Sequence, residues 1–124
     1  MSKYEDNVIS ILKKGKIRFI REKTFSDLKH GLFRFDFYIF DLQGAPAIIE
    51  VDGEQHFKPI YGRQNFLKGQ EYDRQKNSYC LAKGIQLYRI PYWEIKNIHK
   101  AEDIFVPKFL VKSKWHNDYL KAPR

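Results

Sequence analysis

Cysteine is almost absent from this chain. Cys80 is the single cysteine among 124 residues, so neither an intramolecular disulfide nor a cysteine-based zinc site can form. Such sparse use of cysteine is typical of a reducing compartment. The sequence also has no long apolar run, and residues 1–6 lack the apolar core of a signal peptide. We therefore expect a cytoplasmic protein without a membrane role.

Several enzyme motifs are missing as well. The sequence contains no phosphate-binding loop of the GxxxxGK type, no dinucleotide-binding glycine pattern, no HExxH motif and no nucleophile elbow. No repeat, low-complexity tract or Gly/Ser linker divides the chain, so we expect one domain over residues 1–124. The histidines are too scattered to indicate zinc, at His30, His56, His99 and His116.

Basic residues, by contrast, are plentiful. Lys and Arg number 23 against 15 Asp and Glu, which gives a net charge of +8. This surplus favours a polyanionic partner because neutralised phosphates release counterions, although an ordinary charged surface would also explain it. Aromatic residues make up 16% of the chain and supply either a core of large rings or platforms for stacked bases.

The apolar pattern predicts an α/β domain. Ser2 and Glu5 have the spacing of a capping box that opens a first helix, and Gly15 is a plausible stop. A turn at Gly44 connects two strands as a hairpin. A later helix, closed by Gly84, is long enough to make the strands on either side of it parallel. The expected order is α-β-β-β-α-β, a mixed central sheet flanked by helices. The expected strands are residues 17–22, 32–40, 47–52 and 85–90, the second helix is 70–83, and short helices in the tail cover the sheet.

Carboxylates gather where two of these strands end. Glu50 and Asp52 leave one face of the third strand, and Asp36 on the neighbouring strand can meet them across the hairpin. Crowded carboxylates repel one another unless a cation is present, and Mg²⁺ prefers a few carboxylate oxygens plus water. A metal there would polarise a phosphodiester and lower the pKa of an attacking water. His56, beyond the turn at Gly53, can serve as a general acid or base.

Each of these residues also has a plainer interpretation. Single acids at strand ends are usually solvated, and a loop histidine such as His56 is usually hydrogen-bonded for structural reasons. Asp73 and Lys76 share a face of the second helix and can either reach the site or belong to an ordinary solvated face. Glu5 is explained by the capping box, yet an acid there can also reach a metal-bound water. The combination of these residues favours the metal site.

Four segments together resemble a known family. Residues 35–38, 48–57, 73–80 and 84–93 resemble the very-short-patch-repair-like branch of the PD-(D/E)XK nuclease superfamily. The nearest relatives are the EDxHD homing endonucleases and similar small proteins common in phage genomes. The resemblance covers about residues 5–98, most of the chain. It implies a restriction-endonuclease-like core and a cytoplasmic setting in a bacterial or phage-infected cell.

The resemblance also implies roles for individual residues. Asp36 would be the central metal ligand, His56 the catalytic histidine and Asp73 the acid on the later helix. Glu5 would be the acid on the first helix, and Glu50 matches the acidic position of the superfamily motif.

The chain departs from this superfamily at one position. Asp52 stands where the superfamily has a lysine, so either His56 or Lys76 must supply the missing cation or proton transfer. This departure affects how water would be activated and leaves the expected reaction class unchanged.

We therefore expect an endonuclease that cuts or nicks DNA with Mg²⁺, for which Mn²⁺ substitutes. Asp36 and Glu50 would hold the metal with help from Asp52, Asp73 would orient His56 or a water, and Lys76 would contact the scissile phosphate. Lys108, Lys112 and Lys114 are the candidate contacts to the DNA backbone.

The remaining alternatives concern partners and turnover. Homing relatives usually owe target choice to an appended DNA-binding domain, so a homodimer or a separate DNA-targeting partner is possible. A nucleic-acid-binding module that has lost turnover is the first alternative, supported by Asp52 at the lysine position. A protein-interaction factor of phage origin, which would bind neither DNA nor metal, is the second.

Overall fold

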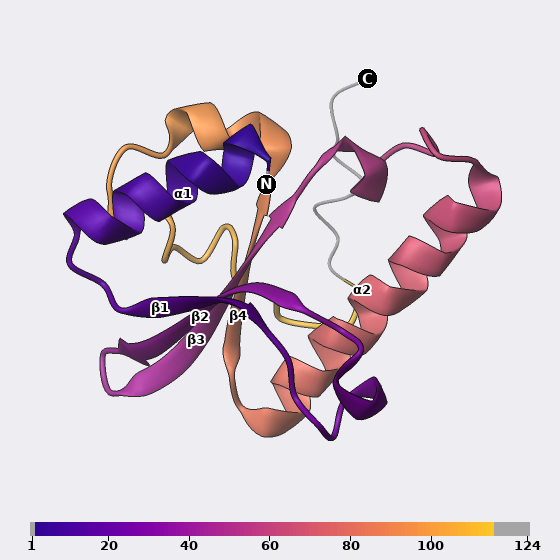
Figure 1. Cartoon of the computed structure of the whole chain (residues 1–124), viewed down its shortest axis with the longest axis horizontal. Coiled ribbons are helices and arrows are strands. Elements are labelled where there is room, and N and C mark those ends of the chain that lie inside the picture. Colours follow the sequence, from indigo (N-terminus) through magenta and orange to yellow (C-terminus); the bar gives the residue numbers. More distant parts are fainter. Residues whose placement is uncertain (1, 116–124) are drawn as a thin grey trace.

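The computed structural model describes residues 2–115 and confirms an α/β fold with a mixed open sheet (Figure 1). The strand order is β1-β2-β3-β4; the first three strands are antiparallel and β4 runs parallel to β3, as the helical crossover predicted. The main elements are α1 (Lys3–Lys14), β1 (Phe19–Lys23), β2 (Phe35–Leu42), β3 (Ala45–Asp52), α2 (Arg63–Lys83) and β4 (Gln86–Pro91). Short 3₁₀ turns are η1 (Lys29–Gly31), η2 (Glu54–His56), η3 (Tyr92–Asn97) and η4 (Ala101–Asp103).

The first helix begins and ends as its sequence predicts. The Ser2 hydroxyl accepts a hydrogen bond from the backbone N–H of Glu5 at 3.2 Å, which satisfies a donor that the first turn of a helix leaves open. Gly15 ends the helix, and its N–H donates to the carbonyl of Ile11. Val8 is fully buried, so the side of α1 that carries Val8 packs against the sheet.

A two-residue turn joins β2 to β3. Gln43 and Gly44 both have positive φ values, 54° and 96°, which is the backbone of a tight hairpin turn. The N–H of Gly44 also donates to Oδ1 of Asp41 at 2.7 Å. Leu42 pairs with Ala45 next to the turn, but the register shifts by one residue between Leu42 and Ile39. Farther along the hairpin, Ile39 pairs with Ala47, Tyr38 with Ile48 and Phe37 with Ile49.

The two main helices lie on opposite sides of the sheet (Figure 1). On the α1 side, Leu12 belongs to a core that includes Ile49 and Ile90. On the α2 side, Cys80 packs in a smaller core with Ile48. The second core is smaller because much of the surface between the sheet and α2 is polar, and that polar region holds the candidate site.

Two boundaries differ from the expectation by more than two residues, the start of α2 and the start of β2. α2 begins at Arg63, well before the expected start at residue 70, because Gly69, a poor helix former, lies inside the helix without ending it. β2 begins at Phe35 instead of residue 32, and the ring of Phe33 packs on that of Tyr72 at 5.0 Å. Within residues 2–115, the helices are too short or too polar to cross a membrane.

Candidate active site

One face of the sheet changes from apolar to polar along its strands. Ile48, Glu50 and Asp52 alternate along β3 on the side of α2, and Leu87 and Arg89 do so along β4. All five side chains are buried. Burying charged groups next to an apolar core is costly unless they are paired or bind a ligand. This end of the sheet is therefore the candidate site.

Asp36 and Glu50 lie opposite each other in the hairpin. Phe37 pairs with Ile49, so the next residues on the two strands are Asp36 and Glu50. The backbone N–H of Asp36 donates to Oε1 of Glu50 at 3.2 Å. The N–H of Val51 donates to Oδ2 of Asp36 at 2.7 Å. The structure thus brings together two of the acids that the sequence analysis selected.

The environment of these two acids disfavours their negative charge. Burial, reinforced by the charge of Glu50, raises the pKa of Asp36 to about 8, although the N–H of Val51 opposes the shift. Burial also raises the pKa of Glu50, against the lowering effect of Lys76 and Arg89. Adjacent carboxyls of this kind retain a proton at neutral pH unless a cation stabilises the ionised forms. Such a pair is a candidate ligand set for a divalent cation.

α2 brings a lysine to the acid pair. The Nζ of Lys76 lies 3.3 Å from Oε1 of Glu50 and donates to the carbonyl oxygen of Arg34 at 2.5 Å. It also lies 5.1 Å from the centre of the Phe35 ring. The side chain of Lys76 is only 14% exposed, so its charge is directed into the site and not into solvent. α2 therefore supplies a positive charge beside the acid pair.

His56 and Asp73 form a second pair at the same end of the sheet. The Nδ1 of His56 lies 2.8 Å from Oδ2 of Asp73 and 3.7 Å from Oδ1 of Asp52. Burial alone would lower the pKa of His56, but the charges of Asp52 and Asp73 outweigh it and raise the pKa to about 9. The imidazole is consequently charged at neutral pH. Its Nδ1 faces the two aspartates, and Nε2 has no hydrogen-bond partner among residues 2–115.

A buried arginine joins the two pairs. The Nη1 of Arg89 donates to both carboxylate oxygens of Asp52, at 2.9 and 3.2 Å, and its Nη2 lies 3.5 Å from Oδ1 of Asp73. Its Nε donates to Oδ1 of Asn77 at 2.8 Å. Asp52 is itself fully buried, so the structure places it in a pair with Arg89 rather than in open contact with the cleft.

Arg89 was missed by the sequence analysis, although a signal was present. Arg89 is a charged residue in a strand whose neighbours Leu87, Tyr88 and Ile90 are apolar, and a charge within a buried apolar strand must be paired. Arg21 was missed as well. Its Nε donates to the backbone carbonyl of Asp36 at 3.3 Å, but a lone arginine on an edge strand gives no comparable signal.

Glu5 combines the two interpretations that its position allowed. Its Oε2 accepts a hydrogen bond from the Ser2 hydroxyl at 3.1 Å, as the capping box predicts. Its Oε1 lies 2.6 Å from Nη2 of Arg21, whose guanidinium contacts the backbone of Asp36. The charge of Glu5 contributes to the raised pKa of Asp36. Glu5 therefore lies within electrostatic reach of the acid pair.

A cleft of about 480 Å³ opens onto this region. His56, Asp73 and Lys76 line it on one side, so the charged pair and the lysine are accessible from the same opening. The other lining residues come from the segment before β2 and from α2, namely Leu32, Phe33, Arg34, Gly69 and Tyr72.

The three lysines of the tail differ in what they contact. Lys108 forms an ion pair with Glu94 at 2.7 Å. Lys112 and Lys114 are exposed and form no ion pair within residues 2–115. The Nζ of Lys114 lies 5.6 Å from the centre of the Trp115 ring. Lys112 and Lys114 are thus better placed than Lys108 to meet an anion.

The side chains of Asp36 and Glu50 are compatible with a divalent metal, but Asp52, the third ligand expected from the sequence, does not join them. Among residues 2–115, no group of three or more His, Cys, Asp and Glu side chains is arranged to hold a metal ion. Asp36 and Glu50 remain as an adjacent pair, and Mg²⁺ commonly uses one or two carboxylates with waters and substrate phosphate.

Comparisons of the chain with family models, curated proteins and solved structures find no match.

Proposed function

We propose that this protein is a metal-dependent DNA endonuclease with a restriction-endonuclease-like core, related to very-short-patch-repair and EDxHD homing enzymes. The observation that supports it best is the juxtaposition of two charge clusters at one end of the sheet. The half-buried Asp36 and the buried Glu50 form an acid pair beside Lys76, and the His56–Asp73 pair opens into the same cleft as that lysine. The net charge of +8 suits a polyanionic substrate.

Asp36 and Glu50 are the residues that would hold the metal. A bound Mg²⁺ would supply Lewis-acid polarisation of the phosphodiester and a lower pKa for an attacking water. The two carboxyls have raised pKa values, so their ionised forms gain the most from a cation. In this proposal Asp52 positions Arg89 and does not coordinate the metal.

His56 is suited to donate a proton to the leaving oxygen. With a pKa of about 9 it carries its proton at neutral pH, so general-acid chemistry fits better than general-base chemistry. Oδ2 of Asp73 accepts a hydrogen bond from Nδ1 of His56, which fixes the orientation of the ring. The Nε2 proton is then the one available to a substrate in the cleft.

Lys76 would replace the lysine that the superfamily has at the position of Asp52. Its ammonium group contacts Glu50 and lines the cleft, where a phosphate oxygen would be its natural partner. Positive charge at this place would stabilise the negative charge that develops on the phosphorus oxygens. In this proposal α2 supplies the lysine that the sequence of β3 lacks.

A binding module without turnover is the second candidate. The observation that favours it is the Lys76–Glu50 ion pair, because an internal cation can neutralise an acid that a metal would otherwise neutralise. Such a protein would bind DNA in a salt-sensitive manner and would not be stabilised by Mn²⁺.

A nicking assay distinguishes the two candidates. Supercoiled plasmid is incubated with the protein and Mg²⁺, with and without chelator, and the Asp36→Asn and His56→Gln variants are compared with Glu102→Gln. Glu102 is exposed and lies outside the site, so its variant is the matched control. We expect cutting by the wild type and the control only. Cutting that persists in both site variants would exclude this site, and binding without cutting would favour the module.

A further inference from the structure

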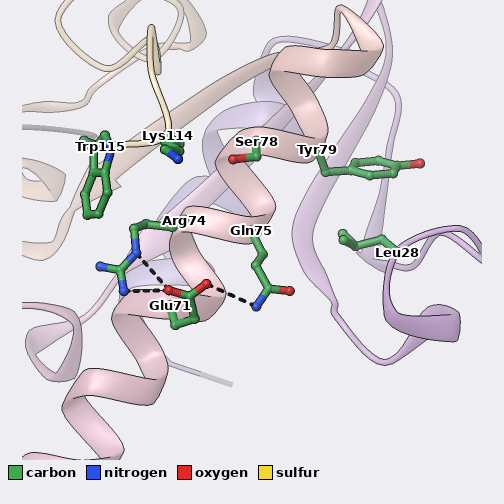
Figure 2. A pocket seen from close by; sticks show the side chains of 8 residues that line it. All are labelled: Leu28, Glu71, Arg74, Gln75, Ser78, Tyr79, Lys114 and Trp115. Carbon is green, nitrogen blue, oxygen red and sulfur yellow. Dashed lines mark hydrogen bonds and ion pairs between the residues drawn. The ribbon is translucent and has the colours of Figure 1, made fainter.

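A second pocket lies on the outer face of α2, away from the cleft. It has a volume of about 540 Å³, within the range of small-ligand sites. Arg74 and Ser78 contribute to it from the helix, whereas Asp73 and Lys76 point to the cleft. Successive helical residues are rotated by about 100°, so the two groups occupy different faces of one helix. Figure 2 shows the pocket with Trp115 on one side of α2 and Leu28 on the other.

Trp115 forms one wall of this outer pocket. Trp115 is 57% exposed, so a large part of its surface is open to a ligand. Its segment is nevertheless held in place, since the carbonyl of Lys114 accepts from Nδ2 of Asn77 at 3.1 Å. The hydroxyl of Ser113 also donates to the carbonyl of Trp115 at 3.0 Å. An exposed ring on an anchored backbone is a preformed stacking surface.

Two cations flank the indole. The guanidinium carbon of Arg74 lies 4.8 Å from the ring centre, and the Nζ of Lys114 lies 5.6 Å from it. Glu71 orients Arg74 by accepting from Nε at 3.0 Å and from Nη2 at 2.7 Å (Figure 2). Arg74 and Lys114 carry two positive charges and Glu71 carries one negative charge, so the net charge of these three residues is positive. Nη1 of Arg74 and Nζ of Lys114 have no hydrogen-bond acceptor within residues 2–115.

We infer that the outer pocket binds one nucleotide of an unpaired nucleic-acid strand. The base stacks on Trp115, and the adjoining phosphate binds Arg74 and Lys114. Ser78 lines the pocket on the side of Lys114 and can hydrogen-bond the edge of the base (Figure 2). Bases in an intact duplex are stacked on one another, so only a single-stranded or unpaired region offers a free base face. An acidic peptide would satisfy the two cations but would not use the indole.

This inference rests on the proposed function and narrows its substrate. α2 separates the outer pocket from the cleft by the width of a helix, about 10 Å, so the bound nucleotide flanks the reacting phosphate. Asn77 holds the backbone of Lys114 and also accepts from Nε of Arg89, which contacts Asp52. The outer pocket and the candidate active site are thus connected through one buried side chain. The substrate we infer is DNA with an unpaired stretch beside the cleavage position.

Tryptophan fluorescence tests the inference without relying on cleavage. The full chain is titrated with a short oligothymidylate, with an abasic strand of the same length and with polyglutamate, in chelator. We expect quenching by the oligothymidylate, about tenfold weaker binding of the abasic strand and of Trp115→Ala, and little competition from polyglutamate. Trp115→Phe should keep most of the affinity and lose the quenching.

A matched control comes from the other side of the molecule. Phe40 on β2 is also an exposed ring under an arginine, with Arg18 at 5.1 Å, but lies outside the outer pocket. Phe40→Ala and Arg18→Gln should bind like the wild type, and Arg74→Gln should weaken binding. Equal affinity for the abasic strand, equal effects of the two ring deletions, or full competition by polyglutamate would each overturn the inference. Asp36→Asn should bind the strand normally, so loss of cleavage in that variant leaves this result independent.

Discussion

The ammonium group of Lys76 on α2 lies 3.3 Å from a carboxylate oxygen of Glu50 on β3. A buried acid is thereby paired with a half-buried lysine that lines the same cleft as His56. The pair is structural if it serves only to neutralise Glu50, and functional if Lys76 also meets a phosphate. The two roles predict different outcomes for a substitution.

Lys76→Met should reduce cleavage by at least about 100-fold, because a positive charge beside the reacting phosphate is lost. Protein stability should fall less than activity, since burial raises the pKa of Glu50 and so lowers the cost of losing its partner. Plasmid nicking and urea unfolding measure the two effects. Lys83→Met is the control, since Lys83 lies on the same helix but pairs with the exposed Asp27. Equal loss of activity in both variants would count against a role for Lys76.

Mn²⁺ should raise the melting midpoint, and Asp36→Asn should abolish the rise. A ligand at about 100 times its Kd adds roughly 2.7 kcal/mol to the stability of the folded state, which for a domain of this size is a shift of roughly 8 °C. The shift should be larger at pH 9 than at pH 6, because protons compete for Asp36, whose pKa is about 8. Differential scanning fluorimetry with Glu102→Gln as control decides the matter; the same shift in Asp36→Asn would remove Asp36 from the metal site.

Stability without metal should fall as the pH rises from 6.5 to 9. The pKa of His56 is raised from 6.5 to about 9, so its stabilising effect is complete below pH 6.5 and is lost as the pH rises through 9. We expect a loss of roughly 2 kcal/mol from this group. Urea unfolding across this range measures it. The pH dependence should shrink in His56→Gln and persist in His99→Gln, where the histidine is exposed.

Arg89→Met should destabilise the fold by roughly 3–5 kcal/mol, because Asp52 and Asp73 would both lose a buried cation and only His56 would remain to pair with them. Urea unfolding at neutral pH provides the measurement. Arg18→Met removes an exposed arginine and should change stability by less than about 0.5 kcal/mol. A small effect at Arg89 would show that water can reach the network and that its charges are less buried than the structure indicates.

The sequence was sufficient for the order of elements and for the acid pair. Strand alternation and a glycine turn are local signals, and together they predicted that Asp36 and Glu50 meet across a hairpin. The long segment before Gly84 predicted the parallel crossover in the same way. These features depend on residues close together in the chain, where periodicity is informative.

The polar network under α2 was harder to foresee. The buried face of α2 carries Asp73 and Asn77 next to Cys80, so it lacks the apolar stripe by which a packed helix is normally found. Arg89 contacts residues 12, 16 and 37 positions away, and no pattern within one segment reports such partners. The beginning of α2 was missed for another local reason, since Gly69 has a low helix propensity although the helix continues through it.

The register shift between Ile39 and Leu42 has a consequence for the two acids. If the pairing of Leu42 with Ala45 continued unchanged along the hairpin, Asp36 would stand opposite Val51, whose side chain points to the α1 side. One extra residue in β2, close to the turn of the hairpin, shifts the strand pairing so that the two carboxyl-bearing residues lie opposite each other. Removing that residue would separate the two acids without altering either of them, so this bulge determines the geometry of the acid pair several residues away.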